Sequence, residues 1–376
     1  MPICVAVPHE TVPGERRVAL VPAVAELLAR QGAEVLLQSG AGAAAFYRDS
    51  EYSSARLTED RSELFGQADI LLTVQPLDQE AIGQLREGST VIGFLHPHEH
   101  PECIAMMRDR NITGFSVELI PRLSRAQGMD ALSSQASIAG YKAALMAASR
   151  TARFFPMLTT AAGTIRPAKV LIIGVGVAGL QAIATAKRLG AMVEAYDVRP
   201  ETREQVESLG AKFVDVKVKA EGSGGYAREL TDEEKRQEVA VLAEHVIQAD
   251  AIISTAAVPG RPAPCIISAD MVDQMKHGAV IIDLAAESGG NCELTVPGEA
   301  FGHERVMIYG PLNVPAMLPV HASEMYAKNL YNFLSLIIRD GQVDPDWDDE
   351  IVASATLTHS GEIRHEPTRQ AVEAAS

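Results

Sequence analysis

The sequence predicts an α/β protein with two Rossmann-like domains, each built on a parallel sheet and joined by long helices. Its 376 residues exceed what one ordinary hydrophobic core serves, so two domains are expected. Short apolar runs alternate with amphipathic helical segments, and this order favours parallel strands with helices on both faces of a sheet. A strand, a glycine-rich turn and a helix follow one another near residue 175.

The first expected domain begins with a strand at residues 3–7. An amphipathic helix is predicted at 22–31, with Pro22 at its start and Gly32 just beyond its end. A second strand is expected at 34–38. The alternation continues through helices near Ser62, at 80–85 and at 102–110, and through strands at 70–74, 90–95 and 112–117. No glycine fingerprint follows the first strand.

The most informative stretch runs from Lys169 to Asp197. An apolar run at 170–173 ends in three glycines spaced G-x-G-x-x-G, and a helical pattern follows. The first glycine allows a sharp turn, the second lets the backbone approach a pyrophosphate, and the third brings helix and strand together. A second apolar run ends at Asp197, whose carboxylate suits an adenosine ribose. Because this carboxylate would repel a 2′-phosphate, even with Arg199 nearby, the pattern favours NAD(H) over NADP(H).

The remaining elements follow in order along the chain. Small residues after the strand expected at 251–254 leave room for a ligand. The stretch 217–229 is either a flap that closes with Tyr226 over a ligand or an ordinary surface loop. Further elements are expected as helices at 200–209, 232–247 and 323–338, a strand at 279–284 and a fraying end after residue 363. The expected domains are therefore 1–136 plus 313–376, and 137–312.

Composition argues against several classes of function. The formal net charge of −16 disfavours nucleic acid and anionic membrane surfaces as partners. The four cysteines are far apart, so neither a disulfide framework nor a zinc site is expected. No apolar run approaches the length of a membrane span, and the N-terminus lacks a signal-peptide pattern. His96, His98 and His100 alternate along the chain, but prolines flank them and no further ligands complete a metal site, so no metal is expected.

A polar loop precedes a helical segment that is rich in alanine from Ser134 onward. Its side chains include Arg122, Gln127, Asp130 and Ser133. Two interpretations remain open. The loop is either a capped helix start, with Asp130 or Ser133 as N-cap, or a site whose amide, hydroxyl and guanidinium groups hold a nicotinamide carboxamide and a diphosphate at a domain junction.

Five stretches resemble a single family: PRLSRAQGMDALSSQASIAGY, IIGVGVAGLQAIATAKRLGA, GGYARE, PGRPAP and IIDLAAESGGNCELTVPGE. Together they are similar to the NAD(H)-binding first domain, or α subunit, of the proton-translocating nicotinamide nucleotide transhydrogenases. The resemblance implies a chain that binds NAD(H) and exchanges hydride directly with NADP(H) on a partner domain, while a membrane-spanning partner translocates protons. It also implies a homodimer that is cytoplasmic, with no membrane insertion of its own, and peripheral at the inner membrane through its partners.

The resemblance also assigns cofactor contacts to residues of this chain. They lie in the polar loop, in the glycine turn, after the second strand of the fingerprint, in the flap and at two later positions. Together with the three fingerprint glycines, the set is Arg122, Gln127, Gly128, Met129, Asp130, Ser133, Gly174, Val175, Gly176, Val177, Gly179, Asp197, Val198, Arg199, Gly225, Tyr226, Gln237 and Ala257.

The implied reaction needs no catalytic acid, base or nucleophile. Direct hydride transfer between two nicotinamide rings moves no proton to or from a substrate, so general acid–base chemistry is not required. The protein has only to hold the rings in a near-attack arrangement. Arg122, Gln127, Asp130 and Ser133 are the expected orienting residues, because they would fix the carboxamide.

The chief alternative is alanine dehydrogenase, a related family with the same two-domain plan. Its pattern carries a K-V-K-E-P segment after the third strand, where this chain has Thr73-Val-Gln75-Pro76 without a lysine. Two features favour the alternative, because His96 falls near its histidine and Glu287 near its aspartate. Glu287 can equally be an acid, a base or a solvated loop charge. A non-catalytic NAD-sensing module is a third possibility, and the polar loop favours the transhydrogenase.

Overall fold

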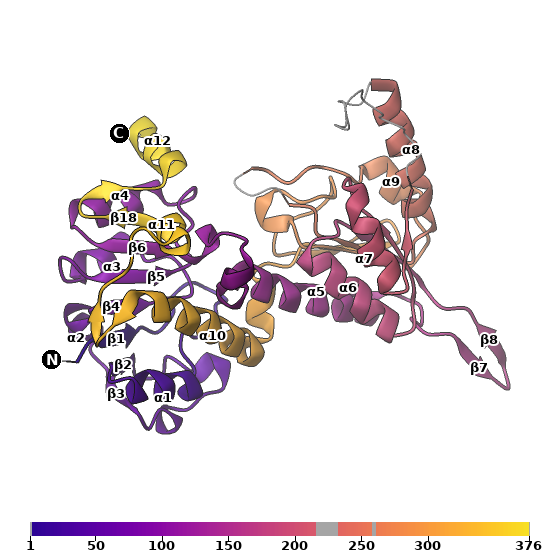
Figure 1. The fold of residues 1–376 in the computed structure, drawn as a ribbon. Coiled ribbons are helices and arrows are strands. Elements are labelled where there is room, and N and C mark those ends of the chain that lie inside the picture. Colours follow the sequence, from indigo (N-terminus) through magenta and orange to yellow (C-terminus); the bar gives the residue numbers. More distant parts are fainter. Residues whose placement is uncertain (1, 216–231, 258–260, 376) are drawn as a thin grey trace. The chain divides into compact units, whose positions relative to one another are not determined.

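The chain folds into two compact units. The computed structural model describes residues 2–215, 232–257 and 261–375, except for the side chains of 232–238 and 375. Unit 1 comprises Met1–Gln135 and Pro315–Ser376, and unit 2 comprises Ala136–Val314 (Figure 1). Helix α5 (Ala131–Arg150) begins in unit 1 and ends in unit 2.

Unit 1 contains an eight-stranded sheet in the order β19-β18-β6-β5-β4-β1-β2-β3. The first six strands of the chain are parallel, whereas β18 pairs antiparallel with β6 and β19 pairs antiparallel with β18. Chain order runs outward in both directions from β1, so the switch point of this doubly wound sheet lies between β1 and β4. The bounds are β1 (Cys4–Val7), β2 (Glu34–Gln38), β3 (Ala55–Thr58), β4 (Ile70–Leu72), β5 (Thr90–Gly93), β6 (Thr113–Ser116), β18 (Thr356–His359) and β19 (Glu362–Ile363).

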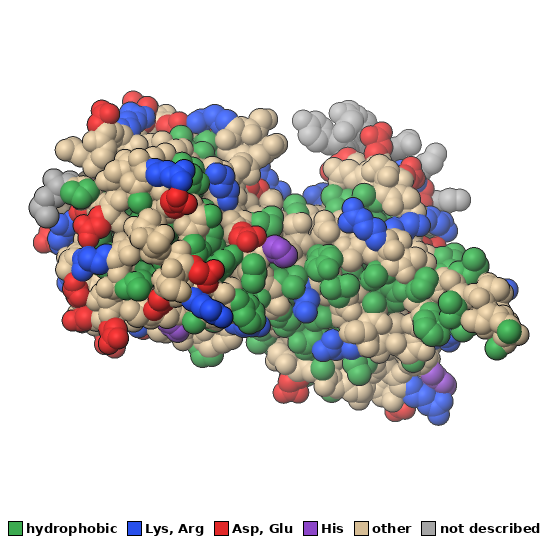
Figure 2. All heavy atoms as spheres, turned by 90° about the horizontal axis from the view of Figure 1, so that it is seen from below, with side chains coloured by type: hydrophobic (Ala, Val, Ile, Leu, Met, Phe, Trp, Pro, Cys, Tyr) green, Lys and Arg blue, Asp and Glu red, His purple; other side chains and the backbone are tan. Residues whose placement is uncertain are grey.

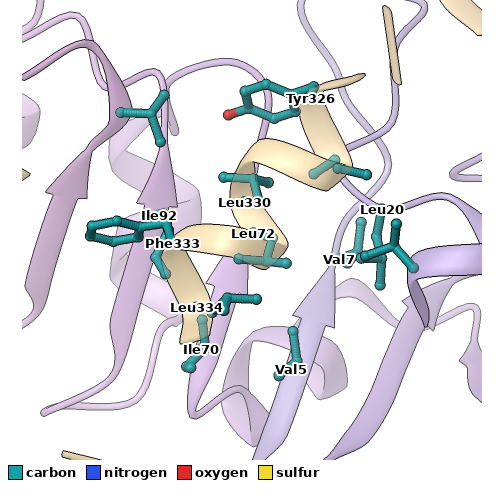
Figure 3. Packing of buried hydrophobic residues seen from close by; sticks show 14 of the residues in the cluster. Val5, Val7, Leu20, Ile70, Leu72, Ile92, Tyr326, Leu330, Phe333 and Leu334 are labelled. Carbon is teal, nitrogen blue, oxygen red and sulfur yellow. The ribbon is translucent and has the colours of Figure 1, made fainter. Parts of the chain in front are cut away.

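Helices cover both faces of this sheet. One face carries α1 (Pro22–Arg30), α10 (Pro319–Ile337) and α11 (Glu350–Ala355). The other face carries α2 (Arg61–Gln67), α3 (Gln79–Gln84) and α4 (Pro101–Asp109). Figure 3 shows apolar side chains of α10 over those of the central strands. Smaller elements are η1 (Ala43–Ala45), η2 (Asp49–Glu51), η3 (Val117–Leu119), η4 (Ser124–Met129) and the paired β16 (Ile338–Arg339) and β17 (Gln342–Val343).

The end of the chain is ordered into helix α12 (Glu366–Ala375), so the expectation that it frays is wrong. Thr368 is 0% exposed and Val372 is 3% exposed. These two residues are four apart and therefore lie on one helical face. Val372 joins the apolar cluster that contains Cys103, Ile104 and Met107 of α4. This buried pair contacts the rest of unit 1, whereas the other described side chains of α12 are exposed or half-buried.

Unit 2 contains a seven-stranded sheet in the order β11-β10-β9-β12-β13-β15-β14. All neighbouring strands are parallel except β14, which pairs antiparallel with β15. This sheet is also doubly wound, and its switch point lies between β9 and β12. The bounds are β9 (Lys169–Ile173), β10 (Met192–Tyr196), β11 (Lys212–Phe213), β12 (Ala251–Ser254), β13 (Val280–Asp283), β14 (Ala300–His303) and β15 (Val306–Tyr309).

The helices of unit 2 follow the expected order, with small differences in extent. Helices α8 and α9 cover one face of the sheet, and α6 packs along β9, β10 and β12. The helix expected at 200–209 is divided into a 3-10 turn followed by a short α-helix. The bounds are α6 (Val177–Arg188), η5 (Pro200–Thr202), α7 (Arg203–Ser208), α8 (Asp232–Gln248), α9 (Ala269–Asp273) and η6 (Ala286–Ser288). The 3-10 helix η7 (Val314–Met317) starts at the last residue of unit 2 and continues into unit 1.

A two-stranded hairpin, β7 (Leu158–Thr160) and β8 (Gly163–Ile165), extends away from the sheet of unit 2 (Figure 1). Every residue of both strands is exposed. Large apolar side chains on and beside the hairpin are also exposed, including Phe154 (54%) and Met157 (64%). Figure 2 shows hydrophobic side chains gathered at this end of unit 2. Within the described residues, no helix combines the length and apolar character that crossing a membrane requires.

Candidate dinucleotide-binding site

The glycine turn lies directly after β9, at the carboxyl edge of the sheet in unit 2. Gly174 has a φ of +89°, a conformation that L side chains rarely adopt. A Cβ atom at this position would lie 2.8 Å from Thr255 Oγ1 and 2.9 Å from the amide nitrogen of Ala256. Both the backbone conformation and the close approach of the residues after β12 therefore require a glycine at the first position of the fingerprint.

The second and third glycines meet different surroundings. Gly176 is the N-cap residue of α6, and a Cβ there would have no neighbour within 4 Å. A Cβ on Gly179 would lie 1.9 Å from the carbonyl oxygen of Gly174. Gly179 therefore serves helix packing, while Gly176 leaves open space at a helix N-terminus. The first-turn amides of α6 carry partial positive charge at that end, which suits an anionic group such as a diphosphate.

Asp197 follows β10 and holds the glycine turn in place. Its Oδ2 accepts a hydrogen bond from the Val175 amide at 2.6 Å, and Arg199 donates to the same carboxylate from its amide, Nε and Nη2, each at 2.9 Å. Burial alone would raise the pKa of Asp197, but the hydrogen bonds from Arg199 and Val175 lower it below its ordinary value. The carboxylate is thus ionised and 5% exposed, and the Arg199 guanidinium is paired with it.

Four further predicted contacts lie in or near this turn. Val175 is buried, whereas Val177 is 41% exposed and Val198 is 76% exposed. Ala257 is exposed beyond the end of β12. All of these residues lie at the carboxyl edge of the parallel strands near the switch point, where ligands of this fold class bind. The structure therefore brings together the fingerprint, Asp197 and Ala257.

The polar loop of unit 1 forms the 3-10 helix η4 and the start of α5. Asp130 caps α5, because its Oδ1 accepts the Ser133 amide at 2.8 Å and its Oδ2 accepts the Ser133 hydroxyl at 2.6 Å. The capped helix start is therefore present. Arg122 and Gln127 are exposed, as is Gly128, while Met129 is buried. The cap fixes the backbone of the loop and leaves the Gln127 amide turned to the surface.

Three predicted contacts cannot be placed in this way. Gly225 and Tyr226 lie outside the described residues, together with the whole of the expected flap at 217–229. The backbone of Gln237 belongs to α8, and its side chain is outside the description.

Two family comparisons cover nearly the whole chain. Residues 6–139 match the family described as alanine dehydrogenase/PNT, N-terminal domain, and residues 143–366 match alanine dehydrogenase/PNT, C-terminal domain. The chain belongs to the alanine dehydrogenase/PNT family.

Members of this family that resemble the chain carry two kinds of name. A Rhodospirillum rubrum protein, named as the first part of NAD(P) transhydrogenase subunit alpha, is 43% identical over 379 residues, which cover 96% of this chain and 97% of that protein. The NAD(P) transhydrogenase subunit alpha of Haemophilus influenzae is 40% identical, covering 95% of this chain and 71% of that protein. The alanine dehydrogenase of Mycobacterium tuberculosis is 31% identical, covering 84% and 82%.

Solved structures of the family confirm the predicted fold class. The transhydrogenase from Sinorhizobium meliloti superposes with a TM-score of 0.85 at 40% identity, covering 97% of this chain and 99% of that one. An L-alanine dehydrogenase superposes with a TM-score of 0.81 at 23% identity over the full length of both chains, which supports the fold alone. The resemblance to transhydrogenases stated from sequence motifs is likewise confirmed.

Unit 1 has a switch point of its own, between β1 and β4, and polar side chains of unit 1 occupy it. Glu10, which follows β1, accepts hydrogen bonds from the amides of Val74 (2.6 Å) and Gln75 (3.2 Å) beyond β4. The Gln75 side chain donates to Glu15 Oε2 at 2.7 Å, and Arg17 Nη2 donates to the same oxygen at 2.7 Å. Burial raises the pKa of Glu10 to about 7, with the Val74 amide opposing the shift. Burial also opposes ionisation of Glu15, yet Arg17 lowers its pKa to about 2.

The residues of uncertain role have ordinary surroundings. Glu287 Oε1 accepts the Asn313 amide at 2.6 Å. His96 Nδ1 lies 3.7 Å from Glu99, and His100 Nδ1 lies 3.8 Å from Glu102. Among the residues that the structure describes, no three His, Cys, Asp or Glu side chains converge as metal ligands would.

Two supporting residues escaped the sequence analysis. Asn291 Nδ2 donates to the carbonyls of Ala256 and Pro264, and its Oδ1 accepts from Ser254 Oγ and the Ala256 amide. This fully satisfied amide holds the residues after β12. Gly140 of α5 is the second, because a Cβ there would lie 2.0 Å from the Ala178 carbonyl in the first turn of α6. The SGGN segment and the small residues of α5 stand out in the sequence. Neither pattern, however, reveals that Asn291 binds the residues after β12 or that Gly140 contacts α6.

Proposed function

We propose that this chain is the NAD(H)-binding subunit of a proton-translocating transhydrogenase. The observation that carries the proposal is the open N-terminus of α6 at Gly176, with the ionised Asp197 carboxylate beside it. Likeness over the whole chain to transhydrogenase α subunits, at 40–43% identity, supports the choice of reaction.

The donor set of unit 2 fits NAD(H) and disfavours NADP(H). The first-turn amides of α6 would bind the diphosphate, with Gly176 permitting the approach. Asp197 would accept from ribose hydroxyl groups by exchanging one of its hydrogen bonds to Arg199. A 2′-phosphate would meet the Asp197 charge, and the guanidinium that could compensate is already paired with that carboxylate. We therefore expect NADP(H) to be bound by a partner domain.

Bound NAD(H) would supply hydride chemistry, and the residues of unit 1 would orient its ring. Gln127 is exposed in η4, and the Asp130–Ser133 cap holds the turn that carries it. Arg122 would add a charged contact. Because no proton moves to or from a substrate, none of these side chains has to act as an acid or a base. Their contribution is the geometry of a near-attack arrangement.

The direct test is isotope transfer between nucleotides. The full chain is mixed with an NADP(H)-binding transhydrogenase partner, NADP⁺ and NADH deuterated at the transferring C4 position, and the NADPH formed is analysed by mass spectrometry. Deuterium should pass from NADH to NADPH without exchange with water. Gln127→Ala should slow this transfer while NADH affinity stays nearly constant, and Ser124→Ala, in the same turn, serves as control. Absence of transfer by the wild-type protein, despite NADH binding, would refute the proposal.

Alanine dehydrogenase activity is the second candidate, supported by the 31% identity to the Mycobacterium tuberculosis enzyme. The pairing of Gln75 and Arg17 with Glu15 speaks against it. A substrate carboxylate needs a cation, and here the Arg17 guanidinium already pairs with an internal carboxylate. NAD⁺ reduction by the purified chain in the presence of L-alanine measures this directly, and no turnover is expected. Binding of NADH with neither activity would instead point to an NAD-sensing role.

The proposed assembly contains two copies of this chain together with membrane-spanning and NADP(H)-binding partners, which would place it at the inner membrane on the cytoplasmic side. The β7–β8 hairpin supports dimerisation, because an isolated two-stranded hairpin is marginally stable in water. Its exposed Met157 and Phe154 would be covered by a second copy. Light scattering should give a dimer for the wild-type chain and a monomer for Phe154→Ser/Met157→Ser, whereas a monomeric wild type would exclude this assembly.

A further inference from the structure

The carbonyl oxygen of Gly128 is held by two side chains of α10. Asn329 Nδ2 donates to it at 2.9 Å and Asn332 Nδ2 donates at 2.7 Å. The approach is so close that a Cβ on Gly128 would lie 2.9 Å from Asn332 Nδ2. Gly128 follows Gln127 in η4, so these bonds fix the peptide beside the proposed carboxamide ligand.

Asn329, the more buried of these two asparagines, is the last member of a series of hydrogen-bonded side chains. Ser134 Oγ donates to Asn329 Oδ1 at 2.7 Å, and Gln135 Nε2 donates to Ser134 Oγ at 3.2 Å. Arg17 Nη1 donates in turn to Gln135 Oε1 at 3.0 Å. The Arg17 guanidinium is anchored by two further bonds to Glu15, from Nε at 2.9 Å and from Nη2 at 2.7 Å.

Most of this series of hydrogen bonds is shielded from water, and only Ser134 is half-buried. Arg17, Gln135 and Asn329 are 5%, 5% and 7% exposed, respectively. A connected network of satisfied polar groups in a low-dielectric interior is rigid, because moving one member leaves another without a partner. The remaining Gln135 contact, to the Ala322 carbonyl at 3.2 Å, ties the chain to the first turn of α10. The ion pair after β1 is thus linked, bond by bond, to the turn that carries Gln127.

We infer that Asn329 and Asn332 are positioning residues for hydride transfer, and that the chain from Arg17 through Gln135 and Ser134 holds Asn329 in place. They set the Gly128 peptide and thereby the direction of the Gln127 side chain. The inference rests on the proposed function, because it takes Gln127 to orient the nicotinamide ring. Neither asparagine touches the ring. Their removal should therefore alter transfer geometry and spare the affinity that comes from the fingerprint in unit 2.

The test is a graded series in the full chain, Asn332→Ala, Asn329→Ala and the double variant, assayed with the NADP(H)-binding partner. Lys328→Ala, next to Asn329 on the exposed side of α10, is the matched control. We expect kcat to fall with each lost donor, reaching about 10- to 100-fold in the double variant, the scale of a misplacement of about 1 Å. The KM for NADH, and its Kd measured by calorimetry, should stay within about twofold.

The outcomes separate this inference from the proposed function. If the wild-type protein fails to bind NADH or to exchange hydride, the proposed function itself is refuted. If the wild-type protein exchanges hydride normally and the double variant has an unchanged kcat, only the positioning role is refuted. A parallel loss of kcat and NADH affinity would also overturn it, because a general loosening of the fold moves both. If the variants at the buried Asn329 do not fold, the half-buried Asn332→Ala still decides, with a smaller fall in kcat expected at constant KM.

Discussion

The two units share the order of the first five strands of each sheet but differ in the residues that follow the first strand at the switch point. In unit 2, two glycines, Gly174 and Gly176, follow β9, and the second of them leaves open space in front of α6. In unit 1, the chain after β1 turns Glu10 onto the amides that follow β4, and Gln75 onto Glu15. The same strand order thus carries the proposed ligand site in one case and an internal polar cluster in the other. What matters is the residue type after the first strand, because topology only supplies the crevice.

Electrostatics distinguishes the two edges as well. Asp197 and Glu10 both accept an amide hydrogen bond from the end of a neighbouring strand. Asp197 accepts from Val175 after β9, whereas Glu10 accepts from Val74 after β4, across the switch point of unit 1. Both carboxylates are partly withdrawn from water. The Arg199 guanidinium bonds directly to Asp197, and the pKa of Asp197 is lowered although burial opposes this. Among the described residues, Glu10 accepts hydrogen bonds from the backbone amides of Val74 and Gln75, and burial raises its pKa to about 7. The edge proposed to bind NAD(H) therefore keeps a permanent charge, and the filled edge carries one that titrates near neutrality.

The largest expected effect comes from filling the open space at the N-terminus of α6 in unit 2. Gly176→Val should lower NADH affinity by about 100-fold or more, because the side chain would occupy the space through which the diphosphate approaches. The unfolding free energy should change by less than about 1 kcal/mol, since no atom lies within 4 Å of the added Cβ. Gly66→Ala, also in open space but in unit 1, is the control. Calorimetric titration with NADH that gives equal affinities would remove the basis of the comparison.

Glu10, in the internal polar cluster at the switch point of unit 1, should make the free energy of unfolding depend on pH. The pKa of Glu10 is raised in the folded state, so its protonated form is favoured by folding. The stabilisation is complete at low pH and is lost as pH rises through the folded pKa of about 7. Glu10→Gln should remove about 2 kcal/mol of the stability difference between pH 5 and pH 8. Scanning calorimetry at both pH values measures this, with the exposed Glu99→Gln as reference. Identical pH profiles for Glu10→Gln and wild type would contradict the assignment.

A change of charge at the open edge should alter coenzyme selectivity. Asp197→Asn removes the charge that repels a 2′-phosphate and weakens the pairing of Arg199. The ratio of the Kd for NADPH to the Kd for NADH should fall by about tenfold, a difference of about 1.4 kcal/mol. Fluorescence titration with both nucleotides provides the ratio. Glu201→Gln, beside the same turn, controls for net charge, and equal ratios in both variants would show that Asp197 does not select the coenzyme.

The smallest expected effect is a difference in stability between substitutions of two threonines. Thr73 directly follows β4 and Thr255 directly follows β12, and each of these strands is the fourth in chain order within its own sheet. Thr255 Oγ1 donates to the Gly174 carbonyl at 2.9 Å, whereas the buried Thr73 Oγ1 has no hydrogen-bond partner among the described residues. Thr255→Val should therefore destabilise by about 1 kcal/mol, and Thr73→Val should be neutral or slightly stabilising. Thermal unfolding of the two variants tests the sign. A loss at both positions would mean that unit 1 uses its threonine as unit 2 does.

Much of this architecture was predictable because burial leaves a pattern. The parallel strands β1, β5, β9 and β12 are buried apolar runs, and the glycine spacing after β9 identified the turn. The hairpin β7–β8, the edge strand β3 and the antiparallel β14 were not predicted. Their residues are largely exposed, so neither a continuous apolar run nor strict alternation marks them.

The candidate site was predictable in composition but not in its pairings. Sequence spacing placed Asp197 and Arg199 near the turn and could not show that the two bind each other. The polar loop offered two interpretations, and the cap formed by Asp130 is the one that local geometry displays. Asn329 and Asn332, which support that loop, lie 201 and 204 residues after Gly128 in the sequence, a separation at which no local pattern connects them.

Gly140 extends the glycine requirement of unit 2 beyond its contiguous fingerprint. The backbone of α5 touches the first turn of α6 with no side chain between them, so a βαβ fragment cut at residue 169 would lack the surface against which its own helix is seated. A transplant of the fingerprint into another scaffold would have to carry this fourth glycine and the helix around it. In this protein the proposed nucleotide-binding module is therefore larger than its sequence motif.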